Sequence, residues 1–278
     1  MTKRNTQVLV DGFTFLEGPR WRNGELWMAE IGAGDVVIVT PEGGRRTVVH
    51  VPGIPSGLGF LPNGTPIVVS IRERRLMRIN GSTLEEHADL STLSPFLNDM
   101  VVDRQGRAYV GNFGFDVLQG EPMKPGSIIL VQPDGQATVV ARGLKGPNGS
   151  VVTADGRLIV AESFANRLTS FPINPDGTLG EQSTQAVLEG APDGICLDIE
   201  GGIWVALFDK SRFVRVLNGK VVETIETPGR HAIACQLGGT DGRTLFCLTY
   251  AGALEDVGKA LTAQVEIVVV DAVGAGSP

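Results

Sequence analysis

The chain has 278 residues, of which 42% are hydrophobic, and its formal net charge is −7. The acidic balance and the lack of a long basic cluster argue against a nucleic-acid-binding surface, which needs gathered Lys and Arg side chains. No stretch reaches the roughly 18 apolar residues of a membrane span, and the first residues, MTKRNTQVLVDG, lack the apolar core of a signal peptide. We therefore expect a cytoplasmic protein that binds neither nucleic acid nor membrane, and the sequence assigns it no oligomeric state.

The 37 glycines and 16 prolines favour a turn-rich, all-β chain. A regular repeat runs from about residue 21 to 248 with no low-complexity linker, which predicts a single domain over residues 1–278. The cysteines Cys196, Cys235 and Cys247 lie in apolar segments without CxxC spacing. Buried free thiols are therefore expected rather than a zinc site or a disulfide.

The repeat places a polar residue seven or eight positions before a turn glycine that opens an apolar strand. In chain order its five clear copies are Glu17…Gly24, Ser56…Gly64, Asn98…Gly106, Asn148…Gly156 and Asp193…Gly201. A sixth, looser copy surrounds Gly242, and the glycines recur every 40–50 residues. This spacing, with several short strands in each period, is typical of β-propeller blades.

Each repeat also contains a second strand pair around a turn such as PEGG, QPDG, NPDG or LNGK, which favours a tight hairpin. Four strands in each of six repeats predict an all-β fold, a six-bladed β-propeller of four-stranded blades. The head strand TQVLVDG and the tail strand VEIVVVDAV are left over. We expect them to pair in the last blade and close the ring, which removes exposed sheet edges.

The polar residues of the repeat would meet around the axis of such a ring. We expect each innermost strand to begin just after its polar residue, so the channel mouth would receive Glu17, Asn98, Asp99, Asn148 and Asp193. Hard cations prefer carboxylate and amide oxygens, and a cation would relieve repulsion between the carboxylates. For any single copy, the competing interpretation is that the polar residue only shapes a turn and binds no ligand. The polar residues occupy the same position in separate repeats, which favours a shared binding site.

The remaining polar residues are assigned by their place in the repeat. Four aspartates beside the turn glycines are expected to cap turns: Asp103, Asp155, Asp198 and Asp241. His50 and His87 fall in outer segments and are expected at the surface. His231 falls at the inner-strand start of the sixth repeat, where it would shuttle a proton, donate a hydrogen bond to substrate, or only line the channel. The chain has no GxSxG, HExxH or P-loop motif.

Several segments together resemble the SMP-30/gluconolactonase/LRE-like (regucalcin-like) family over nearly the whole chain. These are EGPRW at 17–21, LND at 97–99, GPNG at 146–149 and PDGICLD at 192–198. The resemblance implies a six-bladed propeller that holds one divalent cation at the channel mouth through Glu17, Asn148 and Asp193. Ca²⁺ is the expected ion, with Mg²⁺, Mn²⁺ and Zn²⁺ as alternatives. Asn98 would contact the substrate or a metal-bound water, and Asp99 would line the same pocket.

One position differs from the family members that act on sugar lactones and resemble the animal protein of the family. Those members carry an arginine two residues before the asparagine of the LND segment. Here that position is Phe96, and the nearby strand adds Phe113 and Phe115. We expect these side chains to bind substrate and to favour a less hydroxylated or more apolar ring, with packing in the core as the competing interpretation.

The leading hypothesis is a divalent-metal-dependent lactonase that opens a small-molecule lactone, of sugar type or more apolar, to its hydroxy acid. Asp193 would act as metal ligand and general base, with Asp99 as the alternative base. A propeller is also a common binding scaffold, so a non-catalytic, metal-stabilised propeller that binds a small molecule or protein is the first alternative. Another metal-dependent ester or phosphotriester hydrolase is the second.

Overall fold

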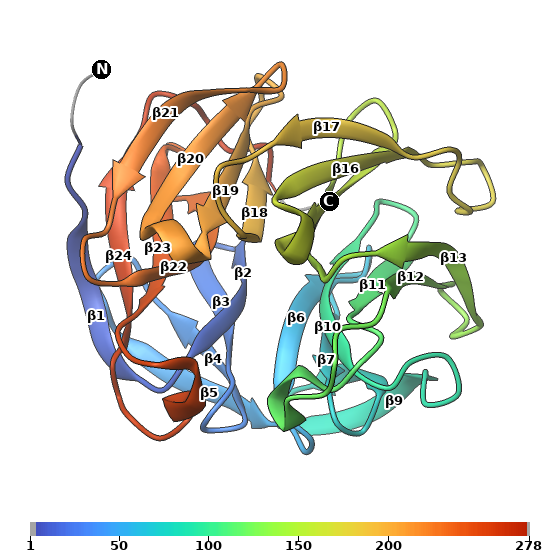
Figure 1. The fold of residues 1–278 in the computed structure, drawn as a ribbon. Coiled ribbons are helices and arrows are strands. Elements are labelled where there is room, and N and C mark those ends of the chain that lie inside the picture. The colour runs from blue at the N-terminus through green and yellow to red at the C-terminus, as the bar shows by residue number, and fades with distance from the viewer. Residues whose placement is uncertain (1–3, 277–278) are drawn as a thin grey trace.

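The computed structural model describes residues 4–276 as six four-stranded antiparallel sheets arranged around an axis (Figure 1). The predicted six-bladed β-propeller is confirmed. No helix in residues 4–276 is long and apolar enough to cross a membrane. Within this described range, four short 3₁₀ turns interrupt the loops: η1 (Val117–Gln119), η2 (Ser163–Ala165), η3 (Phe208–Lys210) and η4 (Leu254–Asp256).

The strands are numbered in chain order. The inner strands are β2 (Leu16–Arg22), β6 (Pro55–Phe60), β10 (Leu97–Val102), β14 (Pro147–Val152), β18 (Pro192–Leu197) and β22 (His231–Gly238). The second strands are β3 (Glu25–Glu30), β7 (Pro66–Ser70), β11 (Ala108–Asn112), β15 (Arg157–Glu162), β19 (Ile203–Leu207) and β23 (Thr244–Tyr250). The third strands are β4 (Asp35–Val39), β8 (Arg75–Asn80), β12 (Gly126–Val131), β16 (Arg167–Pro172), β20 (Arg212–Leu217) and β24 (Ala263–Val269). The outer strands are β5 (Arg45–His50), β9 (Thr83–Asp89), β13 (Ala137–Leu144), β17 (Ser183–Val187), β21 (Lys220–Glu226) and β1 (Gln7–Phe13).

The ring is closed in the sixth blade, where the head and tail of the chain meet. There β1 pairs antiparallel with β24, from Gln7 opposite Ile267 to Phe13 opposite Ala263. The blue strand β1 and the red strand β24 lie side by side in Figure 1. The predicted pairing of N- and C-terminal strands is therefore confirmed, and its ladder joins the start of the chain to the end.

The hairpins have the local chemistry that the sequence predicts. Between β20 and β21, Asn218 and Gly219 have φ of 51° and 75°, and Leu217 pairs with Lys220 across the turn. Positive φ at both central residues is the type I′ geometry, which Asn-Gly adopts readily. In the turn between β4 and β5, Gly43 takes φ of 84° and its amide donates to the Thr40 carbonyl. These turns fix the register of the outer strands.

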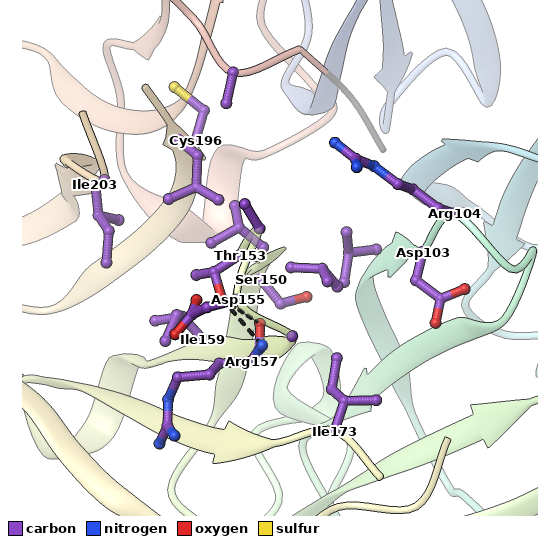
Figure 2. Close-up of a pocket in the computed structure, with 18 of the residues that line it drawn as sticks. Asp103, Arg104, Ser150, Thr153, Asp155, Arg157, Ile159, Ile173, Cys196 and Ile203 are labelled. Atoms are coloured by element: carbon purple, nitrogen blue, oxygen red, sulfur yellow. Dashed lines mark hydrogen bonds between the residues drawn. The ribbon is translucent and has the colours of Figure 1, made fainter. Parts of the chain in front are cut away.

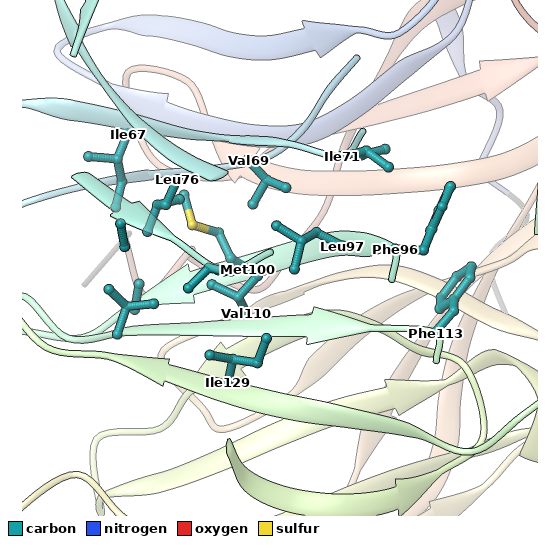
Figure 3. Close-up of a cluster of buried hydrophobic side chains, with 14 of the residues drawn as sticks. Ile67, Val69, Ile71, Leu76, Phe96, Leu97, Met100, Val110, Phe113 and Ile129 are labelled. Carbon is teal, nitrogen blue, oxygen red and sulfur yellow. The ribbon is translucent and has the colours of Figure 1, made fainter. Parts of the chain in front are cut away.

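The core lies between neighbouring blades. One buried cluster joins Ile67 and Val69 of β7 to Leu97 and Met100 of β10, and Val110 of β11 packs against them (Figure 3). Middle strands such as β7 and β11 are covered on both faces, which explains why they read as continuous apolar runs rather than as alternating patterns. The outer strands keep exposed residues, so the hydrophobic burial that stabilises the ring is concentrated toward the axis.

Candidate metal-binding and catalytic site

The polar residue of each repeat occupies the same place in its inner strand, at the second residue. These positions are Glu17, Ser56, Asn98, Asn148 and Asp193, with Ala232 at the same place in the sixth blade. The expectation that the strand begins just after the polar residue is therefore wrong by about two residues. The inner strands contact one another in order around the ring, and β22 closes against β2. The five polar side chains thus enter the channel at one level, its mouth.

A β-bulge follows this level in every blade. The register shifts between Glu17 and Arg20 in the first blade, between Leu97 and Met100 in the third, and between Pro192 and Ile195 in the fifth, and the other three blades show the same shift. A bulge bends a strand locally and re-aims its side chains. The bulges explain how hydrogen-bonded ladders continue below the mouth while the polar residues above them are free to face the axis.

Glycine follows the polar residue in four blades because neighbouring inner strands approach each other there. A Cβ on Gly149 would lie 2.6 Å from the Asp193 carbonyl oxygen of the next blade, and one on Gly18 would lie 2.8 Å from that of Ser56. The close approach is to the next blade, and it sets how closely neighbouring inner strands pack at the mouth.

Three carboxyl groups are buried together at the mouth. Glu17, Asp99 and Asp193 are 9%, 5% and 7% exposed. Burial is the main reason that the pKa of Glu17 lies well above its ordinary value, and the nearby carboxyl groups of Asp193 and Asp99 raise it further. Burial and Asp99 likewise raise the pKa of Asp193, while the Asn148 side chain acts in the opposite direction. These residues are close enough to repel one another when ionised, so as the protein stands the mouth favours protonated carboxyls over charged ones.

Asp193 is the clearest case of an unsatisfied group at the mouth. Its Oδ1 atom is buried and has no hydrogen-bond partner within the described chain. A buried carboxylate oxygen without a partner is costly, and native structures normally satisfy such atoms with protein, water or an ion. Two carboxylates and an amide oxygen form the donor set that a hard divalent cation prefers. The residues present therefore fit a divalent cation.

Asn148 is oriented by a serine that the sequence reasoning did not single out. The Asn148 amide nitrogen donates to Ser163 Oγ at 3.2 Å, and that hydroxyl donates to the Pro192 carbonyl at 2.7 Å. Because the nitrogen is held by Ser163, the Asn148 oxygen remains the free acceptor. Ser163 thus joins the fourth blade to the fifth beside Asp193, through contacts 15 and 29 residues apart in sequence.

Asn98 and Asp99 bring the third blade to the same mouth. The Asn98 amide donates to the Pro147 carbonyl at 3.4 Å, which leaves its oxygen free. Asp99 Oδ1 accepts from the Met100 amide at 2.7 Å and lies 3.6 Å from Arg20 Nη2. Burial raises the pKa of Asp99, and the Arg20 guanidinium opposes that effect. Among the described residues, Asp99 is therefore the mouth carboxyl that pairs with Arg20, which also lowers the pKa of Glu17.

Arg20 is a further residue that the sequence reasoning missed. It is 8% exposed, and it donates to the Pro19 carbonyl at 2.8 Å and to the Met100 carbonyl at 2.6 Å. The signal was present, since an arginine inside a buried inner strand needs carbonyl or carboxylate partners from other blades. Arg20 links the first blade to the third below the mouth.

No group of three or more His, Cys, Asp and Glu side chains within residues 4–276 is arranged to hold a metal ion. The set expected from the resemblance contains only two side chains of those types, Glu17 and Asp193, because the third member is the amide of Asn148. The expected site is therefore of mixed carboxylate and carboxamide kind, which suits Ca²⁺ better than a site of imidazole and thiolate ligands would.

His231 lies at the same end of the channel and is half-buried. Its Nδ1 lies 3.1 Å from the Phe208 carbonyl oxygen, and its ring stacks on the Phe208 ring at 4.4 Å and 6°. Tyr250 flanks the ring on another side at 6.5 Å. A carbonyl oxygen can only accept, so Nδ1 carries a proton in this contact and Nε2 is not part of it. Phe208 and Tyr250 were not foreseen from the sequence.

The predicted aromatic residues form one stack beside the mouth. Phe96 and Phe113 lie 6.1 Å apart, and Phe113 and Phe115 also lie 6.1 Å apart. All three belong to the buried cluster of the second and third blades, and Figure 3 shows the Phe96 and Phe113 rings side by side. The sequence reasoning missed Phe164, which covers this stack and is 43% exposed.

One histidine expectation is wrong. His50 is exposed as predicted, with 68% of its side chain accessible, but His87 is only 7% exposed and neither ring nitrogen has a partner. His87 faces inward from β9, and its carbonyl would lie 2.4 Å from a Cβ on Gly135 in the next blade. Burial, with Arg78 nearby, lowers the pKa of His87. An outer strand still has one covered face, which position in the repeat alone does not reveal.

The turn-capping prediction is confirmed for three aspartates. Asp103 Oδ1 accepts from the amides of Gln105 and Arg107, and Asp198 Oδ1 accepts from those of Glu200 and Gly202. Asp241 accepts from the Arg243 amide. In the fourth blade Thr153 takes this role in place of Asp155, since its hydroxyl accepts from the Arg157 amide at 3.0 Å.

A cavity of about 1050 Å³ lies at the opposite end of the channel, among the turns that join inner to second strands. Arg20, Arg104, Ser150 and Asp155 are among the residues that line it, whereas Glu17, Asn148 and Asp193 are not. Figure 2 shows Asp103 and Arg104 on one side of this cavity and Asp155 and Arg157 on the other. This cavity and the buried carboxyl cluster are therefore at different ends of the channel.

Comparison with known proteins gives consistent matches along the chain. A family model described as "SMP-30/Gluconolactonase/LRE-like region" matches residues 15–251. The chain is 28% identical to 6-deoxy-6-sulfogluconolactonase from Pseudomonas putida over 240 residues, covering 83% of this chain and 81% of that protein. Luciferin-regenerating enzyme superposes with a TM-score of 0.85 at 18% identity, over 99% of this chain and 98% of that one. Regucalcin from Agrobacterium tumefaciens, a calcium-binding protein, superposes with a TM-score of 0.82 at 21% identity, over 100% of this chain and 96% of that one. The two structural likenesses establish a shared fold.

Proposed function

This chain belongs to the SMP-30/gluconolactonase/LRE-like family, and we propose that it is a divalent-metal-dependent lactonase. The similarity to a protein named as a lactonase supports an enzyme that opens a cyclic ester. The observation that carries the proposal is the buried, unpartnered Oδ1 of Asp193 beside the buried carboxyl of Glu17. A closed propeller does not need such charges for its stability, so their presence favours a chemical role.

Glu17, Asn148 and Asp193 are the proposed ligands of a single divalent cation, with Ca²⁺ the expected ion and Mg²⁺, Mn²⁺ or Zn²⁺ the alternatives. When bound, the cation supplies positive charge that polarises the lactone carbonyl and favours the ionised carboxyl ligands. Ser163 fixes the Asn148 amide so that its oxygen is the available donor. Because the ligands come from three separate blades, the rigid ring preorganises the site.

The proposed reaction adds one water across the ester bond. The water oxygen attacks the carbonyl carbon while the Asp193 carboxylate accepts a proton from that water. The bond from the carbonyl carbon to the ring oxygen then breaks, and the proton passes to the leaving ring oxygen. The product is the open hydroxy acid, and Asp193 is returned to its starting state.

Other residues around the mouth would support this step. Asp99 is the alternative base, and Arg20 at 3.6 Å favours its ionised form. Asn98 would hold the substrate through its free amide oxygen. His231, with Nδ1 engaged by the Phe208 carbonyl, would present Nε2 to a substrate hydroxyl. The apolar wall of the substrate pocket would be backed by the buried rings of Phe96, Phe113 and Phe115.

The test is proton release from a panel of lactones, an aryl ester and a phosphotriester, measured with added Ca²⁺ and after chelation. Asp193→Asn removes the proposed base, and Asp155→Asn makes the same change at the exposed position at the other end of the channel. We expect chelation and Asp193→Asn each to lower lactone turnover by at least about 10²–10⁴-fold, while Asp155→Asn stays at the wild-type rate.

The same panel separates the alternatives. Turnover confined to the aryl ester or the phosphotriester would replace the lactonase with another metal-dependent hydrolase. Full turnover by folded Asp193→Asn protein would remove its role as base. No turnover of any substrate, with a cation still bound, would favour the non-catalytic propeller.

A further inference from the structure

We propose that the substrate is a lactone that carries an apolar substituent, and that Phe164 is the residue that selects it. This inference rests on the lactonase function proposed above and specifies the substrate class of the same site. Phe164 combines three properties: it is exposed, it packs against buried rings, and it directly follows Ser163, which binds the proposed metal ligand Asn148.

Phe164 is held rigidly although nearly half of it is accessible. Its ring meets the edge of Phe113 at 5.7 Å and 61° and lies 6.0 Å from the ring of Phe115. Its amide donates to the Lys145 carbonyl at 3.1 Å. A large apolar side chain that is 43% exposed and still fixed in orientation offers contact surface at little entropic cost to a ligand.

The backbone places this ring beside the mouth. Phe164 follows Ser163 in η2, and Ser163 holds the Asn148 amide. The ring also lies over Gly146, where an added Cβ would be 2.5 Å from it, and Gly146 comes two residues before Asn148. A substrate whose carbonyl reaches Asn148 and Asp193 therefore extends its substituent over Phe164.

The loop that packs against Phe164 through Phe113 and Phe115 exposes apolar side chains as well as charged ones. The loop between β11 and β12 starts with the two stacked rings Phe113 and Phe115, and further along it exposes Val117, Leu118 and Met123 at 38%, 50% and 57%. Phenylalanine rings offer no donor or acceptor to a hydroxyl group, and covering a hydroxyl without a partner costs free energy. An alkyl or aryl substituent gains from the same contact.

The experiment is a series of γ-lactones with methyl, propyl and pentyl side chains, compared with glucono-δ-lactone. We expect kcat/KM to rise about fourfold for each CH₂ that the aromatic surface covers, which follows from about 0.8 kcal/mol per buried CH₂. Phe164→Ala should remove most of this dependence on chain length and lower kcat/KM for the pentyl lactone by about tenfold to a hundredfold, a larger loss than for glucono-δ-lactone. Phe164→Trp should retain the rise, and Ile199→Ala, which removes an exposed side chain at the opposite end, should match the wild type.

Calorimetric binding of the hydroxy acid product with the pentyl side chain gives a second readout that does not need turnover. Binding that weakens in Phe164→Ala and persists in Ile199→Ala supports the inference even if no lactone is hydrolysed, in which case the proposed function alone fails. Hydrolysis that is fastest for glucono-δ-lactone, or equal losses by Phe164→Ala across the series, overturns the inference and leaves the lactonase proposal intact. No binding of the hydroxy acid to any variant, together with no chain-length dependence, also overturns it.

Discussion

The two ends of strand β18 carry the same residue type in opposite circumstances. Asp198, just past the end of the strand, is 3% exposed, and its oxygens are fully engaged by the Glu200 and Gly202 amides and by Arg215 at 2.7 Å. Asp193, near the start, is 7% exposed, and its Oδ1 has no partner. The oxygens of Asp198 are satisfied by the fold, whereas Asp193 keeps one oxygen that no described residue satisfies.

The third blade repeats this contrast. Asp103 accepts from two backbone amides and from Arg107 Nε at 2.6 Å, whereas Asp99 has one amide at 2.7 Å and a distant arginine at 3.6 Å. The cavity of about 1050 Å³ lies at the end where the aspartates are satisfied. An unsatisfied buried carboxyl oxygen, rather than the size of a cavity, therefore distinguishes the end of the channel where we place the chemistry.

The largest expected effect on stability is at the satisfied end. Asp198→Ala would leave Arg215, whose side chain is only 12% exposed, without its buried partner and would remove the cap of the turn. We expect the free energy of unfolding to fall by about 3–5 kcal/mol, measured by urea denaturation. Asp193→Asn in chelated protein should not lose stability, because it removes a carboxyl whose ionised form is disfavoured there. Equal losses of unfolding free energy in Asp198→Ala and Asp193→Asn would contradict the difference proposed between the two ends of β18.

Removal of the Ser163 hydroxyl should weaken cation binding without touching a ligand. In Ser163→Ala the Asn148 amide and the Pro192 carbonyl lose a shared partner. Loss of such an orienting group typically costs 10–100-fold in metal affinity, or about 1.4–2.7 kcal/mol. Titration calorimetry measures the loss, and Ser163→Thr, which keeps a hydroxyl, should recover part of the affinity. An unchanged affinity in Ser163→Ala would mean that Asn148 is not oriented in this way.

The stability of chelated protein should fall as the pH rises. Burial raises the pKa of Glu17, Asp99 and Asp193, so the folded chain binds protons more tightly than the unfolded one. Their contribution is fully present below about pH 4, the ordinary carboxyl pKa of an unfolded chain, and is lost as the pH rises through the raised folded values. Each unit of upward shift is worth about 1.4 kcal/mol. The measurement is the melting temperature as a function of pH, which should fall with rising pH in chelated protein. Saturating Ca²⁺ should reduce this fall, and an equal fall with and without Ca²⁺ would argue against a cation at the mouth.

The smallest effect is expected at Asp155. This side chain is exposed at the cavity end, and Thr153 already caps its turn. Asp155→Asn should change the free energy of unfolding by less than about 0.5 kcal/mol and leave cation affinity unchanged. A clear loss of cation affinity in this variant would show that the cavity end, and not the mouth, holds the ion.

The fold was predictable from the sequence because propeller information is local and repeated. The turn glycines near 24, 64 and 106 and the period between them define the blades, and the unpaired head and tail strands define the closure. The polar residues of the mouth were found in the same way, from their common phase. Residues that act between blades were not found. Ser163 contacts Pro192 in the next blade, and Arg20 contacts Met100 across the channel.

The other unforeseen residues have the same physical origin. His87 is covered by the turn of the next blade, and Phe164 is fixed by rings that belong to the third blade. Such contacts depend on how neighbouring sheets are placed relative to one another, which no short sequence window encodes. The repeat predicts which residues reach the axis, and the packing between blades decides which of them are satisfied there.

The most direct test of a cation site at the mouth is calorimetric titration of Ca²⁺ into chelated wild-type, Asp193→Asn and Asp155→Asn proteins. We predict one ion per wild-type chain, the same affinity in Asp155→Asn, and a loss of at least about a hundredfold in Asp193→Asn, because a buried carboxylate ligand is removed. Mg²⁺, Mn²⁺ and Zn²⁺ titrated in the same way identify the preferred ion. Failure of all four ions to bind the wild-type chain, or equal affinity in wild-type and Asp193→Asn proteins, would contradict the account.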